Sequence, residues 1–270
     1  MNIIETREIV LPRRRSPGVD AKALAFYRDL LAPFGQSVDE TRLNAGSGYD
    51  HIEIADKLIE PGFAHRPDLI VVAQALPDLL PFKVVAPWLD HRLGGGARCL
   101  GISQAGAQAP FLALRTVAAY RQAAASSLAL IVFLEQSTLP AAHPVADGRE
   151  LADSGVALVV SDSSGWEVTQ LVTLADAQDI GAAIDAQRGE QGETAAILGP
   201  LITVDVSGVE ILRAERRHYA TAVWRRFAVA AHGLPRAFQT VVLADADPVT
   251  GAGFVVRLQR VDSARPGGDA

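Results

Sequence analysis

A serine stands where a nucleophile could be exposed between a strand and a helix. Ser103 lies in Gly101-Ile-Ser-Gln-Ala105, between an apolar run and a segment with helical spacing. A serine in such a turn can attack a carbonyl if a histidine, oriented by a carboxylate, takes its proton. Asp205 followed by His218 or His232 supplies these residue types in a workable order. One hypothesis is therefore acyl transfer to water through Ser103.

The other candidate groups carry weaker signals. Cys99 is the single cysteine, and its place at the start of an apolar run is typical of a small buried hydrophobic residue. Asp50-His-Ile-Glu53 places two carboxylates around a histidine, but no histidine in the chain has metal-ligand spacing. Gly94-Gly-Gly96 follows a helical segment, which favours a helix end over a phosphate-binding loop. We therefore expect no metal and no bound cofactor.

Composition narrows the class of protein. The chain has 270 residues, of which 49% are apolar and 21% charged, so it can bury a large core and is not a disordered polar chain. A net charge of −6 argues against binding to nucleic acid or to an anionic membrane surface. One cysteine, no apolar run long enough to span a bilayer and no visible targeting segment together favour a cytoplasmic protein.

Strands and helices alternate in the first half. Short apolar runs at 68–72, 97–103 and 128–135 predict strands that are buried on both faces. Helical spacing at 84–93 and 107–121 separates them. Short connections between alternating strands and helices predict an α/β fold with a parallel sheet.

The second half is expected to differ. Residues 156–161 and 167–174, joined by a turn that contains glycine, predict a β-hairpin. A long amphipathic helix is predicted over 209–231, with Trp224 and Phe227 on its core face and arginines on the opposite face.

Four stretches, through their order and spacing, resemble ketoacyl synthase III-type members of the thiolase-like superfamily. The stretches are DLIVVAQALPD (68–78), CLGISQAGAQ (99–108), LADSGVALVV (151–160) and VVLADADPVTGAG (241–253). The last resembles a family strand and turn of the form L-L-x-F-G-x-G-x-x-x-G. The resemblance implies a layered αβαβα sandwich of two pseudo-repeated halves. We expect these halves at 1–175 and, shortened, at 176–262, with a flexible tail at 263–270.

The same resemblance reveals what this chain lacks. The family nucleophile is a cysteine at the N-terminus of the helix after the strand, where the helix dipole and a histidine lower the pKa of its thiol. Aligning Ile102-Ser-Gln-Ala with that strand puts Gly106 at the nucleophile position, and glycine cannot hold an acyl group. Counting back from the last strand puts Arg216 where the family has an asparagine, and no His-Gln-Ala-Asn motif occurs. All three catalytic positions are therefore expected to be lost.

Non-catalytic relatives give the closest resemblance, in particular the small partner subunit of the heteromeric synthase that makes alkylquinolone signals. This implies a heterodimer or heterotetramer with a catalytic synthase III-like subunit, which would carry the acyl-cysteine, in bacterial secondary-metabolite or signal biosynthesis. In this fold a strand pairs with its counterpart across a two-fold axis. Here that partner interface is expected at Leu100, Gly101, Ile102 and Ser103.

Two further expectations concern ligands and alternatives. Arg225 and Arg226, on the exposed helix face, could dock an acyl carrier protein or the phosphates of acyl-coenzyme A. An α/β-hydrolase with Ser103 as its nucleophile remains the alternative, although no upstream His-Gly oxyanion segment is present. A scaffold protein that binds no acyl chain is a third hypothesis.

Overall fold

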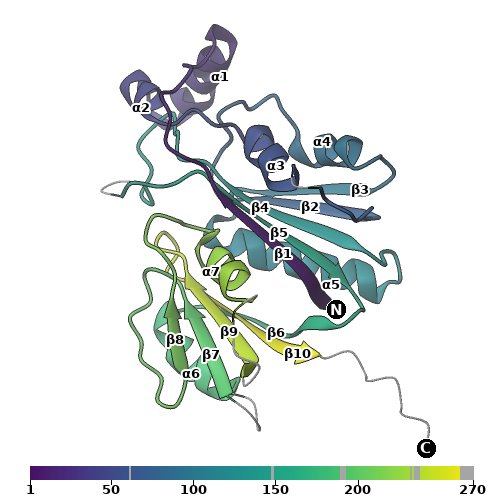
Figure 1. Cartoon of the computed structure of the whole chain (residues 1–270). Coiled ribbons are helices and arrows are strands. Elements are labelled where there is room, and N and C mark those ends of the chain that lie inside the picture. Colours follow the sequence, from purple (N-terminus) through teal and green to yellow (C-terminus); the bar gives the residue numbers. More distant parts are fainter. Residues whose placement is uncertain (61, 147–148, 189–192, 232, 234–237, 262–270) are drawn as a thin grey trace, which may run out of the picture.

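The structure is a computed structural model, and it describes residues 1–60, 62–146, 149–188, 193–231, 233 and 238–261. Within this part of the chain, ten strands form one mixed sheet with the order β3-β2-β4-β5-β1-β6-β10-β9-β7-β8 (Figure 1). The strands are β1 (Asn2–Val10), β2 (Leu69–Gln74), β3 (Arg98–Ser103), β4 (Ala129–Glu135), β5 (Ser154–Ser161), β6 (Gly165–Leu174), β7 (Glu193–Leu198), β8 (Glu210–Arg213), β9 (Phe238–Ala246) and β10 (Gly253–Val261).

Helices cover both faces of this sheet. The α-helices are α1 (Ala21–Leu31), α2 (Glu40–Ala45), α3 (His51–Ile59), α4 (Val85–Arg92), α5 (Ala109–Gln122), α6 (Ile180–Ala186) and α7 (Ala222–Ala231). Short 3₁₀ helices are η1 (Ala32–Phe34), η2 (Gly106–Gln108) and η3 (Ala177–Asp179).

The sheet consists of two groups of strands that repeat each other. β2 pairs in parallel with β3 and β4, and β7 pairs in parallel with β8 and β9. β5 is antiparallel to β4 and β1, as β10 is to β9 and β6. The two groups meet where β1 and β6 pair at Asn2–Glu167 and Ile3–Trp166. The predicted α/β fold of two pseudo-repeated halves is confirmed.

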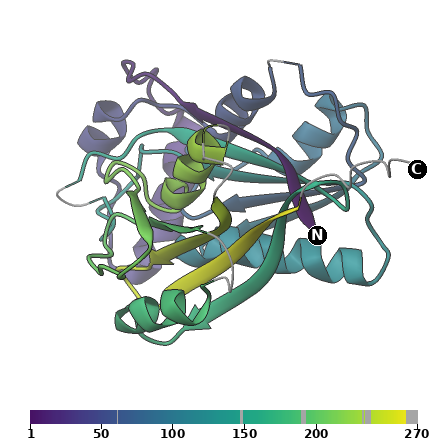
Figure 2. The same ribbon diagram turned by 60° about the horizontal axis from the view of Figure 1, so that its bottom comes forward.

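Five layers result, because α5 and α7 lie between the two halves of the sheet. These two helices share one core, in which the fully buried Trp224 ring lies 5.5 Å from the Phe111 ring and 5.1 Å from the Phe133 ring. α3 and α4 cover the outer face of the first half through a second core (Figure 1). α6 covers the outer face of β9 and β10 through a third core (Figure 2).

Two local predictions are wrong, and long-range pairing is the reason in both cases. β5 and β6 form no hairpin, because β1 lies between them and pairs with both. The helix predicted over 209–231 is helical only in α7, because Glu210–Arg213 forms β8 beside β7. β1 is more than 140 positions from both of its partner strands, and β7 pairs with β8 at a separation of 15 positions.

The second half is shorter than the first, as predicted. Residues 199–209, all of them described, join β7 to β8 without a helix, whereas α4 joins β2 to β3. Strand pairing groups β6, which ends at Leu174, with β7–β10. The division of the halves at 175 stays a prediction. The tail predicted at 263–270 lies outside the described residues.

Candidate functional site

A tight turn joins β3 to η2 and α5, at the position where the nucleophile was predicted to be lost. Gln104 has φ of 58° and Gly106 has φ of 56°, so two residues of the turn are left-handed. This conformation is uncommon for a residue with a side chain, and it suits glycine. The turn directs the first backbone N–H groups of the helical segment toward the second half of the molecule.

The space beside Gly106 is filled by two residues of the second half. A Cβ built on Gly106 would overlap Asp247 Oδ2 and would lie 2.8 Å from the Tyr219 hydroxyl oxygen. Asp247 Oδ2 accepts hydrogen bonds from the backbone N–H of Ala107 at 2.9 Å and from the Tyr219 hydroxyl at 2.7 Å. The Ala107 N–H also lies 3.1 Å from the Tyr219 hydroxyl oxygen. The volume and the N–H group that an acyl-enzyme would need are therefore occupied.

The protonation states of Asp247 and Tyr219 provide no reactive nucleophile. Burial raises the pKa of Asp247, but hydrogen bonds from Tyr219 and from backbone N–H groups of Ala107, Val249 and Thr250 outweigh it, so the pKa lies below its usual value. Burial and the Asp247 carboxylate raise the pKa of Tyr219 far above its usual value. At neutral pH the pair is a carboxylate and a neutral phenol.

A pocket of about 500 Å³ lies over this turn. Gly106, Tyr219 and Asp247 form part of its lining. Apolar side chains from α1, from the end of β2 and from residues 139–142 form much of the rest. This volume is within the range of small-molecule sites, which is roughly 300–1,000 Å³.

His218, the histidine beside the lost asparagine position, is locked in a second network. Its side chain is fully buried, with Nδ1 3.1 Å from Ser154 Oγ and Nε2 2.5 Å from an Arg225 Nη1. Arg225 also donates to Glu8 Oε2 at 2.8 Å and 3.0 Å. Burial and the Arg225 charge lower the pKa of His218 to about 3. His218 is therefore a neutral hydrogen-bonding group held in place on both sides.

Glu135 holds the segment that leads into α7. Its buried carboxylate accepts hydrogen bonds from the backbone N–H of Tyr219 at 2.8 Å and of Thr221 at 3.2 Å. Burial raises the pKa of Glu135 to about 7 in spite of these hydrogen bonds. Burial also raises the pKa of the neighbouring Asp245 to about 8.

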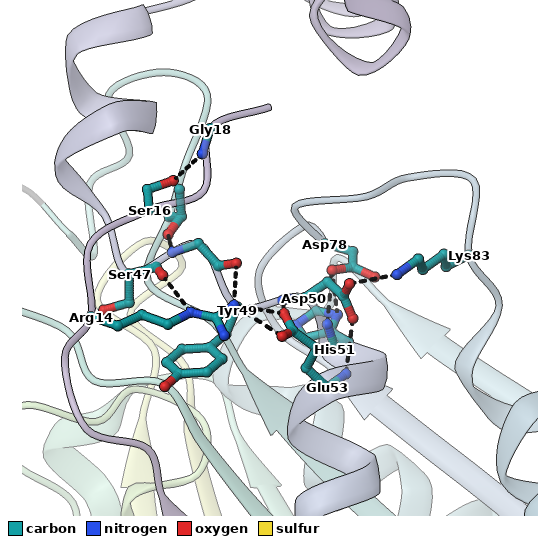
Figure 3. A network of polar contacts seen from close by, with 12 residues as sticks. Arg14, Ser16, Gly18, Ser47, Tyr49, Asp50, His51, Glu53, Asp78 and Lys83 are labelled. Atoms are coloured by element: carbon teal, nitrogen blue, oxygen red, sulfur yellow. Dashed lines mark hydrogen bonds and ion pairs between the residues drawn. The ribbon is translucent and has the colours of Figure 1, made fainter. Parts of the chain in front are cut away.

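The Asp50–Glu53 motif is structural. Asp50 accepts a hydrogen bond from the Glu53 N–H, and Glu53 accepts one from the Asp50 N–H, which forms a capping box at the start of α3 (Figure 3). Lys83 Nζ lies 2.6 Å from Asp50 Oδ2, and the His51 backbone N–H donates to Asp78 at 3.0 Å. These contacts fix the loop after β2, which forms one wall of the pocket.

The arginines and the cysteine do not enter the site. Arg216 lies in an exposed turn, and Tyr219 is the residue of that segment that reaches Gly106. Arg225 is only 8% exposed and is bound to Glu8 and His218, so its predicted place on the exposed helix face is wrong. The half-buried Cys99 packs on the α3–α4 core, and burial raises the pKa of its thiol.

Tyr219 and Asp247 were missed by the sequence analysis, although one signal for Asp247 was present. In the stretch that resembles L-L-x-F-G-x-G, Asp245 and Asp247 stand in the two glycine positions. The side chain missing at Gly106 is thus matched by one added at Asp247 on the facing wall.

Among the residues that the structure describes, the predicted serine triad is not assembled. Ser103 is exposed, and within the described residues no hydrogen bond joins it to a histidine. His218 contacts Ser154 instead, and Asp205 lies 3.3 Å from Arg213 at the surface. His232 lies outside the described residues. Together with the sheet order, this does not favour the hydrolase alternative.

Comparison with known proteins agrees with the geometry. Neither a family model nor a curated protein matches the sequence. Among solved structures, AbyA1, a tetronic acid condensing enzyme, matches with 12% identity and a TM-score of 0.61, over 96% of this chain and 99% of that chain. The 3-oxoacyl-(acyl carrier protein) synthase III FabH of Pseudomonas aeruginosa PAO1 matches with 15% identity and a TM-score of 0.62, over 98% and 99%. A variant of OleA from Xanthomonas campestris matches with 11% identity and a TM-score of 0.60, over 96% and 97%.

The chain has the thiolase-like fold. At these identities the likeness concerns the fold alone. In the described part of the chain, no helix has the length and apolarity needed to cross a membrane. The same residues contain no group of three or more His, Cys, Asp or Glu that could hold a metal ion.

Proposed function

We propose that this chain is a non-catalytic subunit of a ketoacyl synthase III-like condensing enzyme or acyltransferase. Its catalytic partner would carry the acyl-cysteine, in bacterial secondary-metabolite or signal biosynthesis. The observation that carries the proposal is the filled space at Gly106. Asp247 and Tyr219 occupy the volume of the missing side chain and bind the Ala107 N–H that follows it.

The electrostatics of the same turn support the proposal. A thioester gains reactivity when N–H groups stabilise the oxyanion that develops on its carbonyl. Here the Ala107 N–H already donates to an ionised carboxylate, which would repel that oxyanion. His218, with its pKa near 3 and both ring nitrogens engaged, cannot exchange a proton with a substrate near neutral pH.

The outermost strand offers a surface for the partner. β3 ends the sheet, so among the described residues no strand lies along one side of its backbone. Such an edge invites pairing and is usually covered. Leu100 and Ile102 pack against the chain's own core, whereas Gly101 and Ser103 are exposed. The proposed interface therefore uses backbone pairing along Leu100–Ser103.

Because the partner carries the catalytic groups in this proposal, we also assign the binding of the acyl donor to the partner. The acyl donor, a thioester of coenzyme A or of an acyl carrier protein, is bound by the catalytic partner. Arg226 is the remaining candidate for carrier docking, because Arg225 faces inward.

Coexpression with a synthase III-like subunit from the same source tests the proposal. Mass spectrometry should find no acyl adduct on the isolated chain after incubation with acyl-coenzyme A, whereas the partner becomes acylated. Turnover should require both chains. An acyl adduct on this chain alone, or labelling of Ser103 by a fluorophosphonate, would contradict the proposal.

A matched pair of variants tests the interface. Gly101→Arg should abolish assembly, because it places a charged side chain on the exposed edge strand. A Cβ built on Gly101 meets no atom within 4 Å, so the isolated chain should still fold. Ala182→Arg is the control, because Ala182 is exposed on α6, which packs on β9 and β10 in the other group of strands. Equal assembly of both variants would contradict the interface.

A further inference from the structure

The pocket over Gly106 retains a defined shape although its floor carries no reactive group. Its floor is Gly106 with Tyr219 and Asp247. One wall comes from Tyr27, Leu30 and Leu31 of α1, and another from residues 139–142. The volume of about 500 Å³ and the predominance of apolar lining suit a small organic molecule.

The α1 wall is fixed in place, so the pocket is preformed. Tyr27 is 1% exposed, and its hydroxyl donates to the backbone carbonyls of Asp78 and, at 2.9 Å, of Leu79. The neighbouring Phe26 ring packs edge-to-face on Phe82 with a centroid distance of 5.4 Å. A preformed wall reduces the ordering cost of binding.

Charge excludes one large class of ligand. The described residues that line the pocket include no lysine and no arginine, one histidine, His143, and the Asp247 carboxylate on the floor. A carboxylate or phosphate in this pocket would meet a like charge without a guanidinium or ammonium partner. A neutral ligand is therefore favoured over an anion.

Three side-chain amides set the polar contacts. Gln36 lines the pocket from the loop after η1, and Gln104 and Gln108 line it from the turn that joins β3 to α5. A glutamine offers N–H donors and a carbonyl acceptor, which match a ligand group that also has both. Gln104 has the left-handed φ of 58°, and backbone strain of this kind concentrates at ligand sites.

We propose that this pocket binds a neutral, largely apolar small molecule that carries an amide or lactam group. The inference rests on the proposed function in one respect: a pocket without a nucleophile holds its ligand without reacting.

Ligand-observed NMR on the isolated full chain tests this with octanamide and octanoate, which share a chain and differ in head-group charge. Octanamide should bind with a dissociation constant on the order of 0.1–1 mM. Octanoate should bind at least about tenfold more weakly, because its charge is unpaired. Equal or tighter binding of octanoate, or no binding of octanamide, would overturn the inference.

Two pairs of variants locate the binding. Ala105→Phe or Ala141→Phe places a ring in the pocket and should abolish octanamide binding, whereas Ala182→Phe, on an exposed position of α6, should not. Gln108→Leu should weaken octanamide binding roughly fivefold, whereas Gln259→Leu on β10 should have no effect. Binding that survives both phenylalanine variants in folded protein would overturn the assignment. Acyl loading of the chain would instead overturn the proposed function, whatever octanamide does.

Discussion

In the first half of the molecule α5 follows β3, and in the second half α7 follows β8. The start of the α5 segment is held by Asp247, which comes directly after β9. The segment before α7 is held by Glu135, the last residue of β4. β4 and β9 occupy equivalent places in the two groups of strands, so each half sends a carboxylate across to the other.

The carboxyl groups of Asp247 and Glu135 lie in different surroundings. Asp247 faces the pocket, and its hydrogen bonds keep its pKa below the usual value. Glu135 is fully buried, and His218, Arg225 and Glu8 lie on the far side of the same turn. The repeated architecture therefore provides one junction that is open to a ligand and one that is sealed by charge pairs.

The largest effect should come from restoring a side chain at the open junction. Gly106→Cys should destabilise the fold by roughly 4 kcal/mol, because the thiol overlaps Asp247 and the residue stays left-handed. Urea unfolding measures this change, and no acyl adduct should form. Combining it with Asp247→Gly should recover about 2 kcal/mol relative to the sum of the single variants. If the two changes in the free energy of unfolding are strictly additive, the Asp247 side chain does not fill the space that a side chain at residue 106 would need.

Two neighbouring arginines of α7 test how much the charge pairs stabilise the junction before this helix. Arg225→Gln should lower stability by roughly 2–3 kcal/mol, because Glu8 loses its buried partner and His218 Nε2 loses a donor. Arg226→Gln, on the neighbouring residue, should change stability by less than about 0.5 kcal/mol. Thermal unfolding of both variants separates the two roles. Similar losses would mean that the network does not stabilise α7.

The smallest expected effect is a pH slope from the buried carboxyls. Burial raises the pKa of Asp245 to about 8 and of Glu135 to about 7, from ordinary values of 3.8 and 4.5. Their stabilising contribution is present at low pH and is lost as pH rises through 8. His218, with its pKa lowered to about 3 from 6.5, acts in the opposite direction but only below pH 6.5.

Between pH 6.5 and 8, the buried carboxyls therefore change the stability without an opposing contribution from His218. Stability should fall there by at most about 1.4 kcal/mol per pH unit for each group. Denaturant unfolding of the wild type and of Asp245→Asn measures the slope, which should be smaller in the variant. A stability that does not change across this window would show that these carboxyls are already ionised in the folded chain.

Much of the fold could be predicted from the sequence, because fully buried strands such as β4 are continuous apolar runs and their order is characteristic. The contacts of the site could not. Ala107 and Asp247 are separated by 140 positions, and their hydrogen bond depends on how the halves pack. β8 was missed because its four residues become a strand only beside β7. Arg225 was assigned to the surface because a helix pattern does not reveal that Glu8 of β1 lies across from it.

The loop after β2 is held in place by contacts with two helices, α1 and α3. Tyr27 of α1 holds the carbonyl of Leu79, while the start of α3 holds Asp78 through the His51 N–H and Lys83 through Asp50 (Figure 3). A wall clamped at both ends has little freedom to swing aside. The side of the cavity that this loop forms should therefore keep its position when a molecule enters or leaves.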